Sequence, residues 1–278
     1  MISLLLAIAS SALIAIIMRL STNKAPAGKT MLAANYLVCF LLAACYAGFD
    51  RLFPAGDGLL PALGMGVFNG ILYLGGFVMM QRSVKKNGVV LSSVFMKLGL
   101  LVPMALSIFL FGEMPTILQI AGFILAVLAI ILINFKKDGS SATAVGGLLL
   151  LLLMNGGGDA MSKVFEEIGN PALSNQFLFY TFLAAFLLCV LLVIFTKEKP
   201  DITSILFGLL IGIPNFFSAK FLLMALQDVP AVIAYPTFSV AGLLVVTLAG
   251  VLFFKERLEK RQWVALAIIA AALVLLNV

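Results

Sequence analysis

Long apolar runs fill almost the whole chain, and short polar or basic stretches separate them. Each run holds about 20 residues, the length that an α-helix needs to cross the roughly 30 Å hydrocarbon core of a bilayer. The breaks fall at clusters of glycine, proline and charge, which favour turns. The pattern predicts ten membrane-spanning helices, over residues 2–20, 30–49, 59–81, 88–112, 115–135, 145–168, 172–196, 203–227, 231–254 and 260–277.

Composition supports the same fold class. Of the 278 residues, 63% are hydrophobic and 11% are charged, against about 45–50% and about 25% in soluble domains. These fractions exclude an ordinary soluble enzyme and indicate an all-α polytopic membrane protein, since helices satisfy their own backbone hydrogen bonds in lipid. Histidine is absent and the three cysteines lie in apolar runs. We therefore expect no metal site and no cofactor, and we expect no binding to nucleic acid.

The basic residues gather in the connections on one side of the predicted bundle. Most of the 18 lysines and arginines lie in the loops after the first, third, fifth, seventh and ninth predicted helices. Loops rich in lysine and arginine stay in the cytoplasm. We therefore expect a multi-pass integral protein of the cytoplasmic membrane with both termini outside.

The second half of the chain repeats the first. Residues 89–134 align without a gap on residues 232–277, and an upstream segment aligns after a shift of three residues. The polar and glycine identities in these alignments are Glu113/Glu256, Gln119/Gln262, Asn134/Asn277, Gly99/Gly242, Gly66/Gly212, Asn69/Asn215 and Gln81/Gln227. The repeat predicts two domains, residues 1–135 and 145–278, joined by a linker over residues 136–144.

Each repeat holds five predicted helices, an odd number, so the two copies must cross the membrane in opposite directions. Inverted repeats of this kind are typical of secondary transporters, whose binding sites lie between the repeats near the membrane midplane. Two glycine pairs, Gly66 with Gly70 and Gly208 with Gly212, have the spacing that allows membrane helices to pack closely. We expect close helix contacts at both pairs.

Two equivalent segments, FGEMPTILQIAG and FKERLEKRQWVA, end the fourth helix and begin the fifth helix of each half. With the 5+5 arrangement, they resemble the EamA-like family of the drug/metabolite transporter superfamily. The second segment matches less well, because it has Trp263 and Val264 where the first has Ile120 and Ala121. The resemblance implies a central cavity lined by helices one to four and six to nine. Many relatives are thought to keep both termini in the cytoplasm, opposite to the orientation that the loop charges predict.

Four ionisable side chains lie inside predicted helices, where they are costly and usually face a cavity or a partner. They are Lys97 in the fourth helix, Asp159 and Lys163 in the sixth, and Lys220 in the eighth. In a substrate site, Lys97 and Lys220 would attract a carboxylate or phosphate, and Asp159 would bind an ammonium or carry the coupling proton. Alternatively, Lys163 and Lys220 reach the membrane interface, and Asp159 is the structural partner of Lys163, one turn away.

Neutral polar residues are further candidates for the substrate site. The asparagines either face the cavity or bridge helices, and the tyrosines either line the cavity or lie at the membrane interface. These candidates are Asn35, Asn69, Asn155, Asn215, Tyr73 and Tyr235. Glu113 and Glu256 follow helix ends, and we expect them to act at helix N-termini, where the helix dipole favours an anion.

These features predict a secondary transporter that moves a small carboxylate-bearing or zwitterionic metabolite or drug by alternating access. Coupling would be to protons, through Asp159, or by exchange, as in an antiporter. A lipid-precursor flippase and a uniporter or channel of the same fold are the alternative functions. No nucleotide-binding, zinc-hydrolase or serine-hydrolase motif occurs, so we do not expect an enzyme. The expected partners are a small-molecule substrate and the lipid bilayer, and a homodimer is left open.

Overall fold

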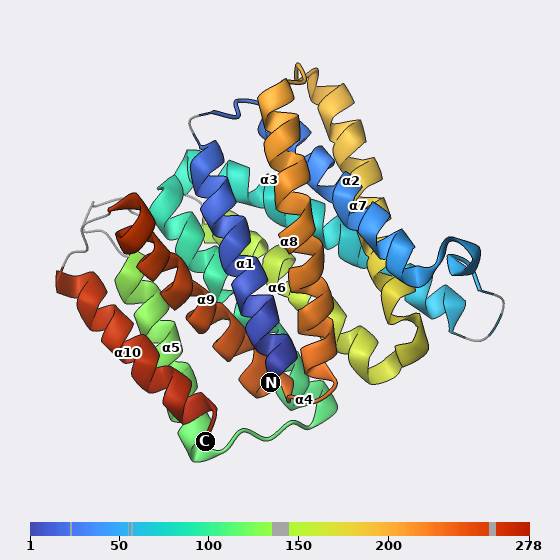
Figure 1. Ribbon diagram of the computed structural model, residues 1–278. Helices are drawn as coiled ribbons and strands as arrows, with labels where there is room; N and C mark the ends of the chain where they lie inside the picture. Colours follow the sequence, from blue (N-terminus) through green and yellow to red (C-terminus); the bar gives the residue numbers. More distant parts are fainter. Residues whose placement is uncertain (23, 55, 57, 135–144, 256–259) are drawn as a thin grey trace. The chain divides into compact units, whose positions relative to one another are not determined.

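The computed structural model describes residues 1–22, 24–54, 56, 58–134, 145–255 and 260–278. Across these residues the chain is all-helical, as predicted, with no strand (Figure 1). The α-helices are α1 (Ile2–Ser21), α2 (Gly28–Ala47), α3 (Leu59–Lys97), α4 (Leu101–Phe111), α5 (Ile117–Asn134), α6 (Val145–Ile168), α7 (Ser174–Thr196), α8 (Ile202–Leu226), α9 (Ala231–Phe254) and α10 (Lys260–Leu276). Three 3-10 helices interrupt them, namely η1 (Phe49–Arg51), η2 (Leu98–Leu100) and η3 (Pro171–Leu173).

Eight helical stretches of the described chain are long and apolar enough to cross a membrane. The sequence predicts ten spans, and the two that do not reach this length are α5 and α10. The apolar part of α5 covers Ile117–Leu132, and α10 has 17 residues. The predicted linker over residues 136–144 lies outside the described residues, as does Glu256.

The expected loop between the third and fourth spans is helical instead. Helix α3 continues through the basic segment to Lys97, where the sequence predicts an end at residue 81. A straight helix would separate Ser83 from Ser92 by about 13 Å at 1.5 Å per residue, yet the Ser92 hydroxyl lies 2.8 Å from that of Ser83. The chain therefore bends sharply between them, and two separate apolar spans, Leu59–Asn87 and Ser92–Phe111, lie on either side.

The chain forms two compact units, and each unit takes helices from both sequence halves. Unit 1 comprises Met1–Leu74 and Val164–Gln227, and therefore holds α1, α2, α7, α8 and the first part of α3. Unit 2 comprises Gly75–Lys163 and Asp228–Val278, and holds the rest of α3 with α4, α5, most of α6, α9 and α10. The units thus do not follow the predicted division at residues 136–144.

Unit 1 is built on two close helix contacts made by glycine. A side chain at Gly66 or Gly70 on α3 would collide with the backbone of α7, and one at Gly208 or Gly212 would collide with that of α2. Only glycine permits such an approach between membrane helices. The close packing predicted from the two glycine pairs is confirmed.

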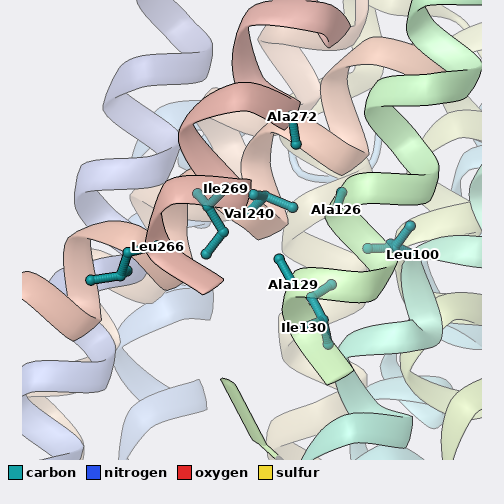
Figure 2. Packing of buried hydrophobic residues seen from close by; sticks show 8 residues of the cluster. All are labelled: Leu100, Ala126, Ala129, Ile130, Val240, Leu266, Ile269 and Ala272. Carbon is teal, nitrogen blue, oxygen red and sulfur yellow. The ribbon is translucent and has the colours of Figure 1, made fainter. Parts of the chain in front are cut away.

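The core of unit 2 lies between α5, α9 and α10. Figure 2 shows Ala126 and Ala129 of α5 in one buried cluster with Ile269 and Ala272 of α10. Leu100 of η2 and Val240 of α9 belong to the same buried cluster. This packing ties the 3-10 segment η2, which follows Lys97, to the hydrophobic core of unit 2.

Helices that are equivalent in the two repeats run antiparallel within the units. In unit 1, Gln176 at the start of α7 donates to the Arg51 carbonyl after α2, and Glu198 after α7 accepts from the Thr30 amide at the start of α2. In unit 2, Gly122 near the start of α5 packs against the end of α10. Two such pairs, α2 with α7 and α5 with α10, therefore have opposite directions.

Candidate functional site

Lys97 and Asp159 are brought together by a break in helical geometry in unit 2. Pro103 lacks the N–H that would bond the carbonyl four residues earlier, that of Gly99, and the chain tightens into η2 at this point. A side chain at Gly156 on α6 would collide with the Gly99 carbonyl. This glycine contact brings the chain segments that carry Lys97 and Asp159 close together.

The two charges interact, and neither is fully enclosed. Lys97 and Asp159 influence each other electrostatically, and both side chains have intermediate exposure. An ionisable side chain on a membrane-spanning helix is costly unless it has a partner of opposite charge or faces a water-filled space. That Lys97 and Asp159 lie at membrane depth remains a prediction, and the structure adds that these two opposite charges act on each other.

Lys163 pairs with Glu113, which the sequence did not suggest. Its Nζ lies 2.8 Å from Glu113 Oε1, and the two side chains are 3% and 14% exposed. Glu113 also accepts a hydrogen bond of 3.0 Å at Oε2 from the Val232 amide, at the start of α9. The prediction that Glu113 acts at a helix N-terminus is confirmed, and its ion pair with Lys163 is an interaction that neither predicted role of Lys163 included.

Tyr235 and Asn155 support the backbone around the charged pair. The Tyr235 side chain is 1% exposed, and its hydroxyl donates to the Asp159 carbonyl at 2.6 Å. Asn155 donates to the Leu151 carbonyl one turn earlier, and its side chain packs against Gly76 of α3. Both residues hold α6 in place beside Asp159.

Asn35 and Asn215 bridge two helices of unit 1. Asn215 Nδ2 on α8 donates to Asn35 Oδ1 on α2 at 3.1 Å. The thiol of Cys39, one turn along α2, lies 3.3 Å from the Gly212 carbonyl. Of the two roles that the sequence left open for these asparagines, the structure records the bridge between helices.

Asn69, the repeat equivalent of Asn215, is in a different state. Its side chain is 0% exposed, and neither its Nδ2 nor its Oδ1 has a hydrogen-bond partner. One turn further along α3, the Tyr73 ring lies 6.3 Å from that of Tyr36 and 6.1 Å from that of Phe182. A buried carboxamide therefore lies next to a group of three aromatic rings, which we call the aromatic triad (Tyr36, Tyr73 and Phe182).

Lys220 is held by an aromatic ring. Its Nζ lies 3.1 Å from the centroid of the Tyr46 ring and 5.8 Å from that of Phe216. A cation over an aromatic face is stabilised by the ring quadrupole, and Tyr46 itself is 48% exposed. Lys220 thus belongs to unit 1, whereas Lys97 and Asp159 belong to unit 2.

Sequence reasoning missed a group of buried polar residues at the bend of α3. Ser83, Asn87 and Ser92 are 3%, 4% and 0% exposed. The sequence signal that could have indicated them is the regular spacing of these polar residues, which fell in a segment that we expected to be a loop. No group of three or more acidic, cysteine or histidine side chains that could hold a metal ion occurs among the residues that the structure describes.

Comparison with known proteins agrees with this architecture. The family model described as "EamA-like transporter family" matches the chain twice, over residues 1–135 and 143–278. A protein of Haemophilus influenzae, described as "Uncharacterized protein", is 23% identical over 279 aligned positions, which cover 95% of this chain and 93% of that protein. A solved crystal structure superposes with a TM-score of 0.76 at 14% identity, covering 99% of this chain and 98% of the other.

These observations define a class of protein: a multi-pass helical membrane protein whose two halves each match the same family model. The chain belongs to the EamA-like transporter family, of the drug/metabolite transporter superfamily. The members of this family are transporters rather than enzymes.

Proposed function

We propose that this protein is a secondary transporter that moves a small carboxylate-bearing or zwitterionic molecule by alternating access. The observation that carries the proposal is the pair Lys97 and Asp159, two opposite charges with intermediate exposure on membrane-spanning helices. Charged residues inside a membrane mark substrate or ion pathways. The opposite directions of equivalent helices within the units support an inverted repeat, the architecture of many such carriers.

A zwitterion matches this pair chemically. Its carboxylate would bind the Lys97 ammonium, and its ammonium would bind the Asp159 carboxylate, so each protein charge exchanges one partner for another. In the empty carrier the two side chains neutralise each other again. Neither state leaves a charged group inside the membrane without an opposite charge, which would be unfavourable.

Coupling takes one of two forms at the same residues. In a proton-coupled carrier, Asp159 would bind a proton when the substrate ammonium leaves. In an antiporter, Lys97 alone would neutralise Asp159, and a second substrate would be needed for the return step. Lys163, Glu113 and Tyr235 would then hold α6 and α9 in position and make no contact with the substrate.

Unit 1, considered by itself, holds further candidate residues for substrate recognition. Lys220 is the candidate that attracts an anionic substrate, since its exposed partner Tyr46 leaves it near the surface of the unit. Asn69 and Tyr73 are candidates for recognition of neutral parts of the substrate. Asn35, Asn155 and Asn215 are bound within the protein and are proposed to act through the arrangement of the helices.

Counterflow in liposomes tests the proposal. Purified protein is reconstituted with an internal pool of one standard L-amino acid, and entry of the labelled compound is measured for each amino acid in turn. We expect saturable counterflow for at least one zwitterion, and a loss of about 30-fold or more in Lys97→Met and Asp159→Asn, since each variant removes one of the two charges that the substrate would bind and a charge-assisted contact that loses its partner costs about 2 kcal/mol or more.

Matched controls and a pH gradient complete the test. Lys199→Ala changes an exposed lysine and should leave counterflow at the wild-type rate. Entry that rises with an imposed pH gradient in wild type, and not in Asp159→Asn, would favour proton coupling over exchange. Full activity of both charge variants would refute the assigned site, and entry that does not saturate would favour a channel.

The proposed location is the cytoplasmic membrane with both termini outside. A reporter enzyme that is active only in the cytoplasm, fused after Val278, should be inactive in this orientation. Activity of that fusion would place the C-terminus inside and would reverse the orientation that the loop charges predict.

A further inference from the structure

The two repeat-related asparagines, Asn69 and Asn215, share one scaffold and differ in one neighbour. Asn215 follows Gly212 by three residues, and Gly212 packs on the Asn35 carbonyl of α2. Asn69 follows Gly66 by three residues, and Gly66 packs in the same way on the Phe177 carbonyl of α7. Phe177 therefore occupies on α7 the position that Asn35 occupies on α2.

This difference explains why one carboxamide is satisfied and the other is not. Asn35 supplies the acceptor for Asn215. The Phe177 side chain has no polar atom, and its ring is stacked on that of Phe165 with centroids 4.3 Å apart. Asn69 is left with an unpartnered donor and an unpartnered acceptor in a fully buried side chain.

An orphaned buried amide requires a physical reason, because its desolvation is not compensated. A purely structural position would be occupied more favourably by leucine, which has a similar shape and no polar atoms. A ligand that enters the unit and offers a matching acceptor and donor would compensate both atoms of Asn69 together. Tyr73, a member of the aromatic triad (Tyr36, Tyr73 and Phe182), lies one turn from Asn69 on the same face of α3.

We propose that Asn69 is a substrate-recognition residue for a neutral, planar group that carries a hydrogen-bond donor beside an acceptor. A carboxamide and the lactam edge of a heteroaromatic ring are the chemical groups of this kind. The amide edge would pair with both polar atoms of Asn69, and the planar face would lie against the aromatic triad. This inference rests on the proposed transport function and adds a second recognition site, in unit 1.

The first experiment compares stability without a ligand. Thermal unfolding of the purified full-length protein is measured for wild type, Asn69→Leu and the matched variant Asn215→Leu. We expect Asn215→Leu to lower the melting temperature, because Asn35 loses its partner. We expect Asn69→Leu to raise it by about 2–4 °C, the shift that follows when one unsatisfied buried group is removed from a chain of this size. A fall in Asn69→Leu as large as that in Asn215→Leu would overturn the inference, since Asn69 would then be a structural residue.

The second experiment adds probes in matched pairs that differ in the amide group alone. Nicotinamide and L-glutamine carry the carboxamide, and nicotinate and L-glutamate carry a carboxylate in its place. We expect at least one carboxamide to raise the melting temperature of wild type by a few degrees more than its acid, and the difference to vanish in Asn69→Leu but to persist in Asn215→Leu. Equal shifts within each pair, or an unchanged response in Asn69→Leu, would overturn the inference.

Failure of this inference can be told apart from failure of the proposed function. If counterflow depends on Lys97 and Asp159 while the Asn69→Leu protein binds and transports as wild type, only the recognition role of Asn69 fails. If the carboxamide response depends on Asn69 while no zwitterion shows counterflow, the transport proposal fails and the binding site stands.

Discussion

Unit 1 and unit 2 use different chemistry to join helices that lie far apart in the sequence. In unit 1 the joints along the helices are neutral: the Asn35–Asn215 bond, close glycine contacts and a chain of aromatic rings. An ion pair of this unit, Lys29 with Glu198, lies at the ends of α2 and α7, and the two side chains are 24% and 18% exposed. In unit 2 the joints are ionic: the Lys163–Glu113 pair and the neighbouring charges Lys97 and Asp159. The comparison shows that the charges inside unit 2 lie where segments from the two repeats contact each other. On our proposal, two of these charges also bind a charged substrate.

The largest effect expected from this contrast is the loss of the ion pair in unit 2. Lys163→Met leaves the Glu113 carboxylate buried without its lysine, which should reduce the free energy of unfolding by about 3–5 kcal/mol. Denaturant titration in detergent measures the change. Lys199→Ala, at an exposed lysine, should stay within about 0.5 kcal/mol of wild type.

A double variant sharpens this prediction. Lys163→Met combined with Glu113→Gln removes both charges and retains an amide oxygen that can accept from the Val232 amide. Most of the lost stability should return, because no buried charge remains unpaired. Equal stability of Lys163→Met and the Lys199→Ala control would break the comparison, since the ion pair would not hold unit 2 together.

The next effect concerns the glycine that brings Lys97 and Asp159 together. Gly156→Ala forces a methyl group against the Gly99 carbonyl and should destabilise the protein by about 1–3 kcal/mol. Gly147→Ala, on the same helix with nothing within 4 Å of the added carbon, should be neutral or more stable by up to about 1 kcal/mol. Equal melting temperatures for the two variants would contradict the close contact of η2 with α6.

A smaller effect is expected at the neutral bridge of unit 1. A double-mutant cycle on Asn35→Leu and Asn215→Leu should give a coupling energy of about 1 kcal/mol, typical of a hydrogen bond between membrane helices. The same cycle on Asn35 and Asn69 should give a value near zero. A coupling in unit 1 as large as the loss in Lys163→Met would remove the distinction between the two units.

The smallest effect is expected at the surface of unit 1. Tyr46→Leu removes the ring face under the Lys220 ammonium and should cost about 0.5–1 kcal/mol, the usual strength of an exposed cation–π contact. Tyr46→Phe keeps the ring and should be close to wild type. Melting temperatures of both variants check the difference, and a loss in Tyr46→Phe as large as in Tyr46→Leu would assign the effect to the hydroxyl instead.

Much of the fold could be predicted because it depends on short-range patterns. Apolar runs of spanning length and their breaks predict the helices, and the glycine spacing predicts the contacts at Gly66 and Gly212. The bend of α3 was expected as a loop at residues 82–87, since polar and basic residues gather there. A polar and basic segment is compatible with a loop or with a helix, so its sequence alone does not decide between them. In the structure the chain is helical at this point.

The pairing of the charges could not be predicted in the same way. Spacing of one turn placed Lys163 beside Asp159 on one helix, and the structure pairs Lys163 with Glu113 and places Lys97 beside Asp159. Both contacts join residues more than 45 positions apart in the sequence. They depend on the packing of η2, α6 and α9, which no local pattern contains.

The amino-acid order was sufficient to establish a membrane-embedded helical chain, an internal repeat and the few charged residues within its apolar runs, because hydrophobicity, spacing and similarity between halves can be counted along the chain. Tertiary structure alone decided which polar groups are satisfied. Asn69 and Asn215 are the same residue at equivalent positions of the repeat, and only the neighbour across the helix contact, Phe177 in one case and Asn35 in the other, leaves one amide unpaired. Hydrogen bonding acts over about 3 Å, so it is decided by which helices touch.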